Sequence, residues 1–252
     1  MTDHLKNTNL HETHTPSAIA DRLATPADHS YLGDFVLGAI DGAVTTFAVV
    51  AGVAGANMSY GVALILGAAN LVADGFSMAV SNYLSTKAER HVVDRVREIE
   101  AHHIDHVPDG EREEIRQIFS SKGFQGALLD QIVDTITEDR HRWIDTMVTE
   151  EFGLRLETPS PFRAAGVTFV AFAAAGLVPL LPLCLPLPPG TAFSVSIVLT
   201  TMTFLLVGMI KGHVVHRPKL TSGIETLVVG SLAAAMAYGA GAFLKGLVDW
   251  VP

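Results

Sequence analysis

The chain has 252 residues, of which 49% are hydrophobic, and it carries a formal net charge of −9 at pH 7 with a mean hydropathy of +0.35. The negative charge argues against a nucleic-acid partner, because nucleic-acid phosphates bind cationic surfaces. A single cysteine, Cys184, excludes an intrachain disulfide framework and a thiolate zinc site.

The first 30 residues are polar and contain no apolar stretch of the kind found in a signal peptide. We expect residues 1–30 to form a disordered, solvated tail, with auxiliary metal capture as the alternative role of its histidines. These histidines are His4, His11, His14 and His29.

Three long stretches without Asp, Glu, Lys or Arg follow the tail, at 42–73, 164–210 and 226–244. A bilayer core about 30 Å thick requires about 20 apolar residues per helix, and lipid leaves no backbone polar group a partner outside the helix. A polar turn near Asn57 divides the first stretch, and a proline cluster divides the second. The chain is therefore predicted to be an all-α membrane protein with five transmembrane helices. The predicted spans are 32–56, 61–85, 162–182, 191–212 and 223–246.

Residues 31–86 thus hold transmembrane helices 1 and 2, residues 162–252 hold helices 3 to 5, and residues 87–161 form an insert between them. The segment 86–161 carries ten Lys and Arg residues, whereas the two turns on the opposite side carry none. Because cytoplasmic loops are enriched in Lys and Arg, we expect the N-terminus and the insert to be cytoplasmic. The insert also carries 17 acidic residues, which suits a cation as its partner.

The first two predicted spans carry polar side chains at helical spacing. Thr45 follows Asp41 by one turn, and Asn70, Asp74 and Met78 are each four residues apart, so each set lies on one helix face. Charged residues inside a membrane are costly and indicate function by default. Oxygen donors with one thioether favour Fe2+ or Mn2+ over Mg2+, and carboxylates can exchange protons for metal. These five residues are the candidate transport pathway; hydrogen bonding between helices for Asn70 and core packing for Met78 are the structural alternatives.

Three further polar positions have simpler explanations. Asn82 extends the second stripe by one turn, and Asp34 lies near a helix N-terminus, where anions are favoured. The segment from Ser222 to Glu225 has the spacing of a capping box, so we expect it to begin the last span.

The insert is predicted to continue the second span to residue 107 as a charged helix, with a turn at Pro108–Gly110. Three further helices are expected at 111–121, 125–137 and 140–153. Metal-type donors recur along these helices at i, i+3 or i, i+4, although such pairs are common on solvated faces. The pairs are Glu100 with His103, Glu111 with Glu114, and Met147 with Glu151.

Between Tyr31 and Trp250 the sequence resembles the vacuolar iron transporter family, which includes plant, fungal, bacterial and nodulin-like proteins. The first and second spans match through Ala39–Gly42 and through Ser77-Met78 with Tyr83–Ser85. The remaining motifs are Trp143–Met147, Glu151–Leu154, Pro179–Pro182, and Gly230–Ala235 with Tyr238.

The resemblance implies a five-helix homodimer in a lipid bilayer, with a cytoplasmic three-helix metal-binding domain. It also implies export of Fe2+, and often Mn2+, from the cytosol in exchange for protons, across a vacuolar or bacterial plasma membrane. The pathway aspartate and methionine of the family fall on Asp41 and Met78, and an acidic residue of its second span falls on Asn70. Its domain ligands fall on Glu100, Glu111, Glu114, Met147 and Glu151. A further family glutamate falls on His103, and a histidine there favours borderline metals over Ca2+ or Mg2+.

Two other functions compete with the expected one, which is a proton-coupled metal transporter that is not an enzyme and needs no organic cofactor. The first is a membrane-tethered di-iron oxidase, for which Glu100–His103 and Glu138–His141 supply two E-x-x-H pairs. The second is a metal-buffering protein without transport. Both leave the polar stripe of the first two spans without a purpose.

Overall fold

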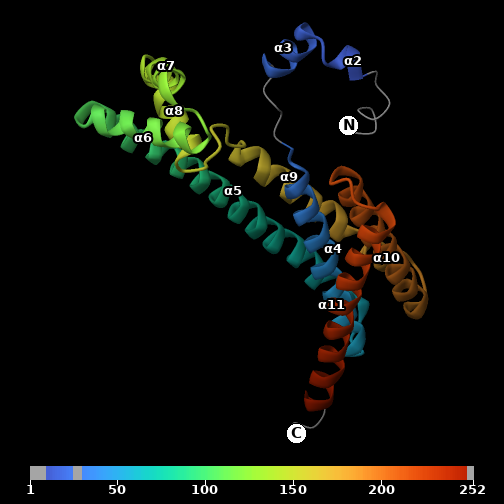
Figure 1. The fold of residues 1–252 in the computed structure, drawn as a ribbon. Helices are drawn as coiled ribbons and strands as arrows, with labels where there is room; N and C mark the ends of the chain where they lie inside the picture. Colours follow the sequence, from blue (N-terminus) through green and yellow to red (C-terminus); the bar gives the residue numbers. More distant parts are fainter. Residues whose placement is uncertain (1–9, 25–29, 249–252) are drawn as a thin grey trace. The chain divides into compact units, whose positions relative to one another are not determined.

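The computed structural model describes residues 10–24 and 30–248, and every regular element in these two ranges is a helix (Figure 1). The chain divides into two compact units. The first comprises Met1–Asn82 with Phe162–Pro252, and the second comprises Tyr83–Pro161. The second unit spans residues 87–161, where the sequence predicts the polar insert, together with residues 83–86.

Five apolar helices lie where the five spans are predicted. Four of them are long and apolar enough to cross a membrane, and the fifth, α9, has 17 residues. At 1.5 Å per residue α9 is about 25 Å long, and it ends before Pro179 because a residue preceding proline disfavours the helical conformation. A short 3-10 helix, η1 (Leu181–Cys184), follows it. The helices are α4 (Leu32–Gly55), α5 (Tyr60–His106), α9 (Pro161–Leu177), α10 (Pro189–Val214) and α11 (Lys219–Val248).

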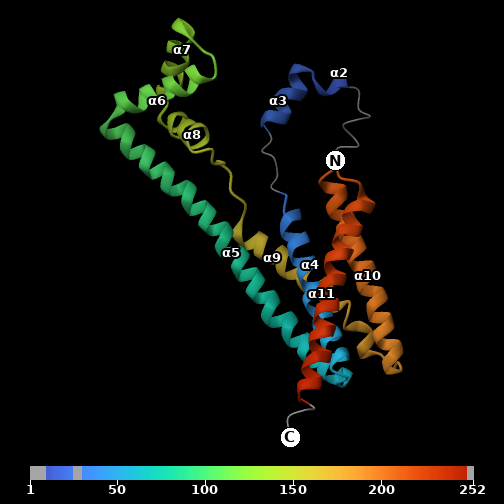
Figure 2. The same ribbon diagram turned by 60° about the horizontal axis from the view of Figure 1, so that its bottom comes forward.

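In the first unit, α4, α10 and α11 lie side by side (Figures 1 and 2). Glycines permit these helices to approach closely. A Cβ atom on Gly241 of α11 would collide with the carbonyl oxygen of Gly52 on α4, and one on Gly42 would collide with that of Phe172 on α9. Such small-residue contacts are typical of helices that associate without a hydrophobic driving force between them.

The second unit contains the end of α5 and three shorter helices around a core of its own. Ile115, Val133, Met147 and Val148 are fully buried in this core. The three helices are α6 (Pro108–Ser121), α7 (Gly126–Thr137) and α8 (Arg140–Glu150).

Two expected features are placed differently. Pro108–Gly110 forms the first turn of α6 rather than a separate turn, because proline is well accommodated at the first helical position. The capping box at Ser222 is wrong: α11 begins at Lys219, so Ser222 lies inside the helix and is buried. The helix starts earlier because the backbone N–H of Ser222 donates to the carbonyl oxygen of Pro218 at 3.1 Å, which makes Ser222 part of the first helical turn.

In the tail, the described residues form two short helices, α2 (Leu10–Thr13) and α3 (Pro16–Ala24), where the sequence predicts disorder. No residue of α3 is buried, so the helix is held by local hydrogen bonds rather than by a core. His4 and His29 lie outside the described residues.

Candidate functional site

The five pathway residues predicted from the sequence lie on partly buried faces of α4 and α5. The side chain of Asn70 donates a hydrogen bond to the hydroxyl of Thr45, with 3.3 Å between Nδ2 and Oγ1. The Thr45 hydroxyl in turn donates to the carbonyl oxygen of Asp41 at 2.8 Å, and the charge of Asp74 acts on Asp41. The structure thus brings four of the five residues together. Met78 lies one turn beyond Asp74 and packs against the apolar core of the first unit.

A second polar contact, among residues that were not predicted as pathway residues, extends this line. The amide of Asn82 on α5 donates to Asp34 Oδ1 on α4 and lies 2.7 Å from Thr168 Oγ1 on α9 as well. The regular spacing of Asn82 after Met78 was the available signal, whereas nothing in the sequence pointed to Thr168. Asp34 therefore links α4 to α5, in addition to lying in the first turn of α4.

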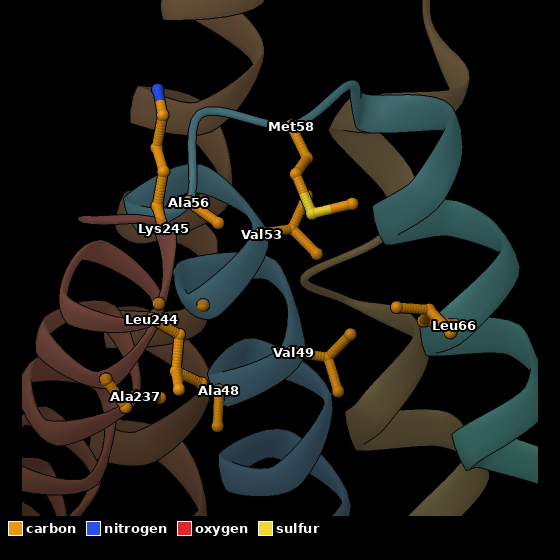
Figure 3. A pocket seen from close by; sticks show the side chains of 12 residues that line it. Ala48, Val49, Val53, Ala56, Met58, Leu66, Ala237, Leu244 and Lys245 are labelled. Atoms are coloured by element: carbon orange, nitrogen blue, oxygen red, sulfur yellow. The ribbon is translucent and has the colours of Figure 1, made fainter. Parts of the chain in front are cut away.

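Toward the end of α4 and the start of α5, the residues on these helix faces become apolar. A pocket of about 780 Å³ lies between α4, the start of α5 and α11 (Figure 3). Ala48 follows Asp41 by seven residues and Leu66 precedes Asn70 by four, so the pocket shares their helix faces. Its one charged lining residue is Lys245, whose amine points away from the other labelled side chains in Figure 3. Without a carboxylate in its lining, this pocket does not supply the oxygen donors of a metal site.

In the second unit, α5 and α6 bring three metal-type donors to one point. Glu100, His103 and Glu111 each offer an atom within 4.8 Å of the others. His103 Nδ1 lies 3.2 Å from a carboxylate oxygen of Glu111 and 3.9 Å from one of Glu100. Both glutamates are buried, with 2% and 3% of their surface exposed, while His103 is exposed.

The buried carboxylates of Glu100 and Glu111 place negative charge in the interior, and a bound cation can neutralise it. The Oε2 atoms of Glu100 and Glu111 have no hydrogen-bond partner, which is costly for buried polar atoms. Burial, followed by the charges of Glu111 and Glu151, raises the pKa of Glu100 to about 8. Burial and the charge of Glu114 also raise the pKa of Glu111 above its ordinary value.

Two more predicted ligands belong to the same electrostatic group. The side chains of Glu114 and Glu151 are exposed. The pKa of Glu151 is nevertheless raised, first by partial burial of its carboxyl group and then by the charges of Glu114 and Glu111. Met147, one turn before Glu151, is fully buried in the core of the second unit. Five of the six predicted donors therefore interact electrostatically, and Met147 contributes to the apolar packing beneath them.

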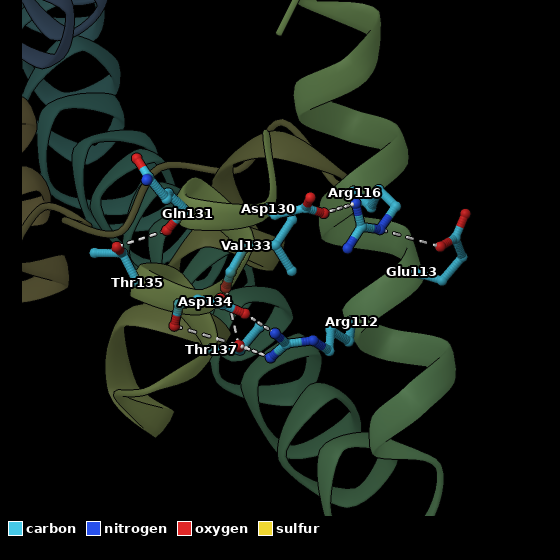
Figure 4. A network of polar contacts seen from close by, with 9 residues as sticks. All are labelled: Arg112, Glu113, Arg116, Asp130, Gln131, Val133, Asp134, Thr135 and Thr137. Carbon is cyan, nitrogen blue, oxygen red and sulfur yellow. Dashed lines mark hydrogen bonds and ion pairs between the residues drawn. The ribbon is translucent and has the colours of Figure 1, made fainter. Parts of the chain in front are cut away.

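On the side of α6 away from the carboxylate cluster, two arginines form ion pairs with α7 (Figure 4). Arg112 forms an ion pair with Asp134, and Arg116 Nη1 lies 2.6 Å from Asp130 Oδ1. Each pair is separated from the other by four residues on both helices, so the contacts lie along one side of each helix. This fastening holds α6 with Glu111 directed toward Glu100.

The second E-x-x-H pair is divided between two helices. Glu138 is the C-cap of α7, whereas His141 lies in the first turn of α8, which Asp139 caps through the backbone N–H of Arg142 at 2.9 Å. Within residues 10–24 and 30–248, the only cluster of three or more carboxylate, histidine or cysteine donors is Glu100, His103 and Glu111. The two-pair ligand set of a di-iron oxidase is therefore not assembled in this part of the chain.

Chemically, the chain presents two separate sets of cation donors. One is a line of carboxylate, hydroxyl and amide groups on apolar helices, and the other is a buried carboxylate cluster with one imidazole at its edge. Oxygen donors with an imidazole suit divalent first-row cations, and these donors must release protons to bind them.

Comparisons with known proteins agree on one family. The sequence model of the VIT family matches residues 32–242. "Vacuolar iron transporter 2" of Oryza sativa subsp. japonica is 34% identical over 209 residues, covering 82% of this chain and 84% of the relative. "Vacuolar iron transporter 1" of Arabidopsis thaliana is 32% identical over 208 residues, covering 81% and 82%. "Vacuolar iron transporter" of Toxoplasma gondii is 32% identical over 234 residues, covering 89% and 78%.

Proposed function

Because this chain belongs to the VIT family, we propose that it exports divalent iron or manganese from the cytosol across a membrane, in exchange for protons. The polar line formed by Asp41, Thr45, Asn70 and Asp74 carries the proposal. It lies on two helices that are apolar and long enough to span a bilayer, where unpaired charges are costly and mark ion pathways.

Iron is the first candidate because the relatives are named iron transporters. Manganese is the second because its divalent ion accepts the same oxygen donors. Met78 adds a thioether on the same face of α5, which favours these ions over Mg2+.

Proton exchange follows from the chemistry of the ligands. A carboxylate must be deprotonated to bind a metal ion, so each cation that reaches Asp41 and Asp74 displaces any proton held there. A proton gradient directed into the cytosol then reloads these carboxylates with protons and releases the metal on the other side.

The carboxylate cluster of the second unit serves, in this proposal, as the cytoplasmic collecting site. Glu100 and Glu111 are buried with unpaired oxygens, and a divalent cation relieves the repulsion between them. The concentration of Lys and Arg between residues 86 and 161 supports a cytoplasmic location for this unit.

The proposed assembly is a homodimer in a vacuolar or bacterial plasma membrane, with α9 and η1 together forming the third span. Large apolar side chains are exposed along α5 and α11, as a lipid-facing or copy-facing surface requires. Examples are Phe76, Val229, Leu232 and Phe243.

Reconstitution into liposomes tests the transport proposal. The purified protein is inserted into vesicles that contain a metal-sensitive dye, and Mn2+ or anaerobic Fe2+ is added outside with an imposed pH gradient. We expect metal entry that accelerates with the gradient and slows when a protonophore collapses it. Protein-free vesicles are the control, and the absence of flux in both gradient directions would contradict transport.

A further inference from the structure

Two histidines of α5 stand outside the cluster formed by Glu100, His103 and Glu111. His102 and His106 are separated by four residues, so they lie on one face of the helix. Their ring centroids are 4.0 Å apart and both side chains are exposed. Two imidazoles at this spacing on a helix can hold one metal ion between them, as in other helical two-histidine sites.

A hydrogen bond fixes which nitrogen of His106 is available. Its Nδ1 lies 2.8 Å from the backbone carbonyl oxygen of His102. A carbonyl oxygen only accepts hydrogen bonds, so Nδ1 carries the proton and Nε2 keeps its lone pair. Metal-binding histidines are characteristically oriented in this way, with the second ring nitrogen donating to a carbonyl or carboxylate.

The surroundings favour a cation at this place. The pair lies in the last two turns of α5, which ends at His106, and the C-terminus of a helix attracts positive charge. The nearby carboxylate of Asp105 is paired with Arg140 at 2.8 Å, so the imidazoles remain the free donors. The ring of His103 is 6.4 Å from that of His102 and turns toward the carboxylate cluster.

We propose that His102 and His106 form a second metal site, which binds a borderline divalent cation such as Ni2+, Cu2+ or Zn2+ with water in the remaining positions. Imidazole suits these ions, whereas Mn2+ prefers oxygen ligands and binds this pair weakly. The site is distinct from the carboxylate cluster but is adjacent to it through His103, so it can deliver captured metal to the cluster.

Nickel titration of the full-length protein in detergent, with any affinity tag removed, tests the site. We expect His102→Ala and His106→Ala each to lower the affinity of one Ni2+ equivalent by about tenfold or more, because each converts a chelate into a single ligand. The matched control is His91→Ala, which removes another exposed histidine of α5 that has Lys87 and Arg95 one turn away instead of a second histidine. All variants keep the tail, so its histidines contribute equally.

A second comparison separates the pair from the carboxylate cluster. Glu111→Gln removes a cluster carboxylate but should leave the Ni2+ equivalent of His102 and His106 in place. Unchanged Ni2+ binding in both histidine variants would overturn the proposal, and so would an equal loss in His91→Ala or in Glu111→Gln. Because the measurement requires no transport, its outcome is independent of the transport proposal.

Discussion

Asn70 on α5 is hydrogen-bonded to Thr45 on α4, with 3.3 Å between the amide nitrogen and the hydroxyl oxygen. The bond ties the two helices together beside Asp41, whose carbonyl oxygen accepts the Thr45 hydroxyl at 2.8 Å. Asn70 therefore has the helix-pairing role that the sequence offers as its structural alternative, and its position next to Asp41 and Asp74 keeps it in the proposed pathway. Mutations in the pathway and in the carboxylate cluster of the second unit should therefore have different effects on transport and on metal binding.

Removing the carboxylate of the pathway should stop transport without affecting the collecting site. We expect Asp41→Ala to abolish proton-dependent metal flux in liposomes, since it removes one of the two carboxylates of the polar line, Asp41 and Asp74, that together hold the cation. Metal binding to the purified variant, measured by titration in detergent, should keep the equivalents that belong to the second unit. An Asp41→Ala protein with normal flux would show that the pathway lies elsewhere.

Neutralising carboxylates of the cluster should weaken metal collection and leave the pathway intact. The double variant Glu111→Gln with Glu114→Gln is expected to lower metal affinity by at least about tenfold, the size of effect produced even by outer-shell changes. Flux at low metal concentration should fall, and flux at saturating metal should recover.

The intervening residue gives the matched control. Glu113 lies on the exposed face of α6, 3.6 Å from Arg116 rather than in the cluster. Glu113→Gln removes one negative charge from the same helix turn, as each substitution of the double variant does, and should leave metal affinity unchanged. Equal weakening in both variants would mean that overall charge, and not the cluster, attracts the metal.

The raised pKa of Glu100 predicts opposite pH dependences for folding and for metal binding. The folded protein holds this proton up to a pKa of about 8, whereas an unfolded chain releases it near 4.5. The metal-free fold therefore gains stability from Glu100 that is complete below pH 4.5 and is lost as the pH rises through 8. Metal affinity should increase over the same interval, because binding displaces the proton.

Thermal unfolding of chelator-treated protein between pH 5 and 8.5 measures the first effect. The contribution of Glu100 is the difference between the wild-type protein and Glu100→Gln, which resembles the protonated carboxyl and does not titrate. The difference should widen as the pH rises, with the wild type becoming the less stable protein. Titration calorimetry in two buffers of different ionisation enthalpy measures the protons released on metal binding. Release that does not change in Glu100→Gln would remove Glu100 as their source.

The sequence predicts the places of all five apolar helices because uncharged runs and prolines are local signals. The predicted span 162–182 nevertheless runs past the end of α9 at Leu177, because the residues after Pro179 are still apolar although the proline ends the helix. Ser222 illustrates a second limit: its capping spacing is present, but packing against Gly208 and Gly212 of α10 places it inside α11 instead.

The candidate sites show the same difference between local signals, which the sequence carries, and contacts that depend on packing between helices. Helical spacing was sufficient to group Asp74 with Asn70 and Glu111 with Glu114, because each pair lies on one helix. The meeting of Asn82 with Thr168, which are 86 residues apart, depends on how α5 and α9 pack, and no local pattern encodes that contact. The spacing of His102 and His106 is present in the sequence but was not among the predicted donor pairs, and only the bond to the His102 carbonyl indicates which ring nitrogen is free.

Close packing of α4 against α9 gives the last prediction. A Cβ on Gly42 would overlap the backbone of Phe172, and backbone atoms cannot move aside as a flexible side chain can. We expect Gly42→Ala to separate the two helices and to destabilise the protein by about 1–3 kcal/mol, the usual result of overpacking. The control is Gly166→Ala on α9, where nothing lies within 4 Å of the added atom and alanine favours the helix by up to about 1 kcal/mol. The melting temperature in detergent should fall for Gly42→Ala and stay level or rise for Gly166→Ala. Because Gly42 adjoins Asp41, flux should fall together with stability, and a Gly42→Ala protein that melts like the wild type would show that α4 and α9 do not pack this closely.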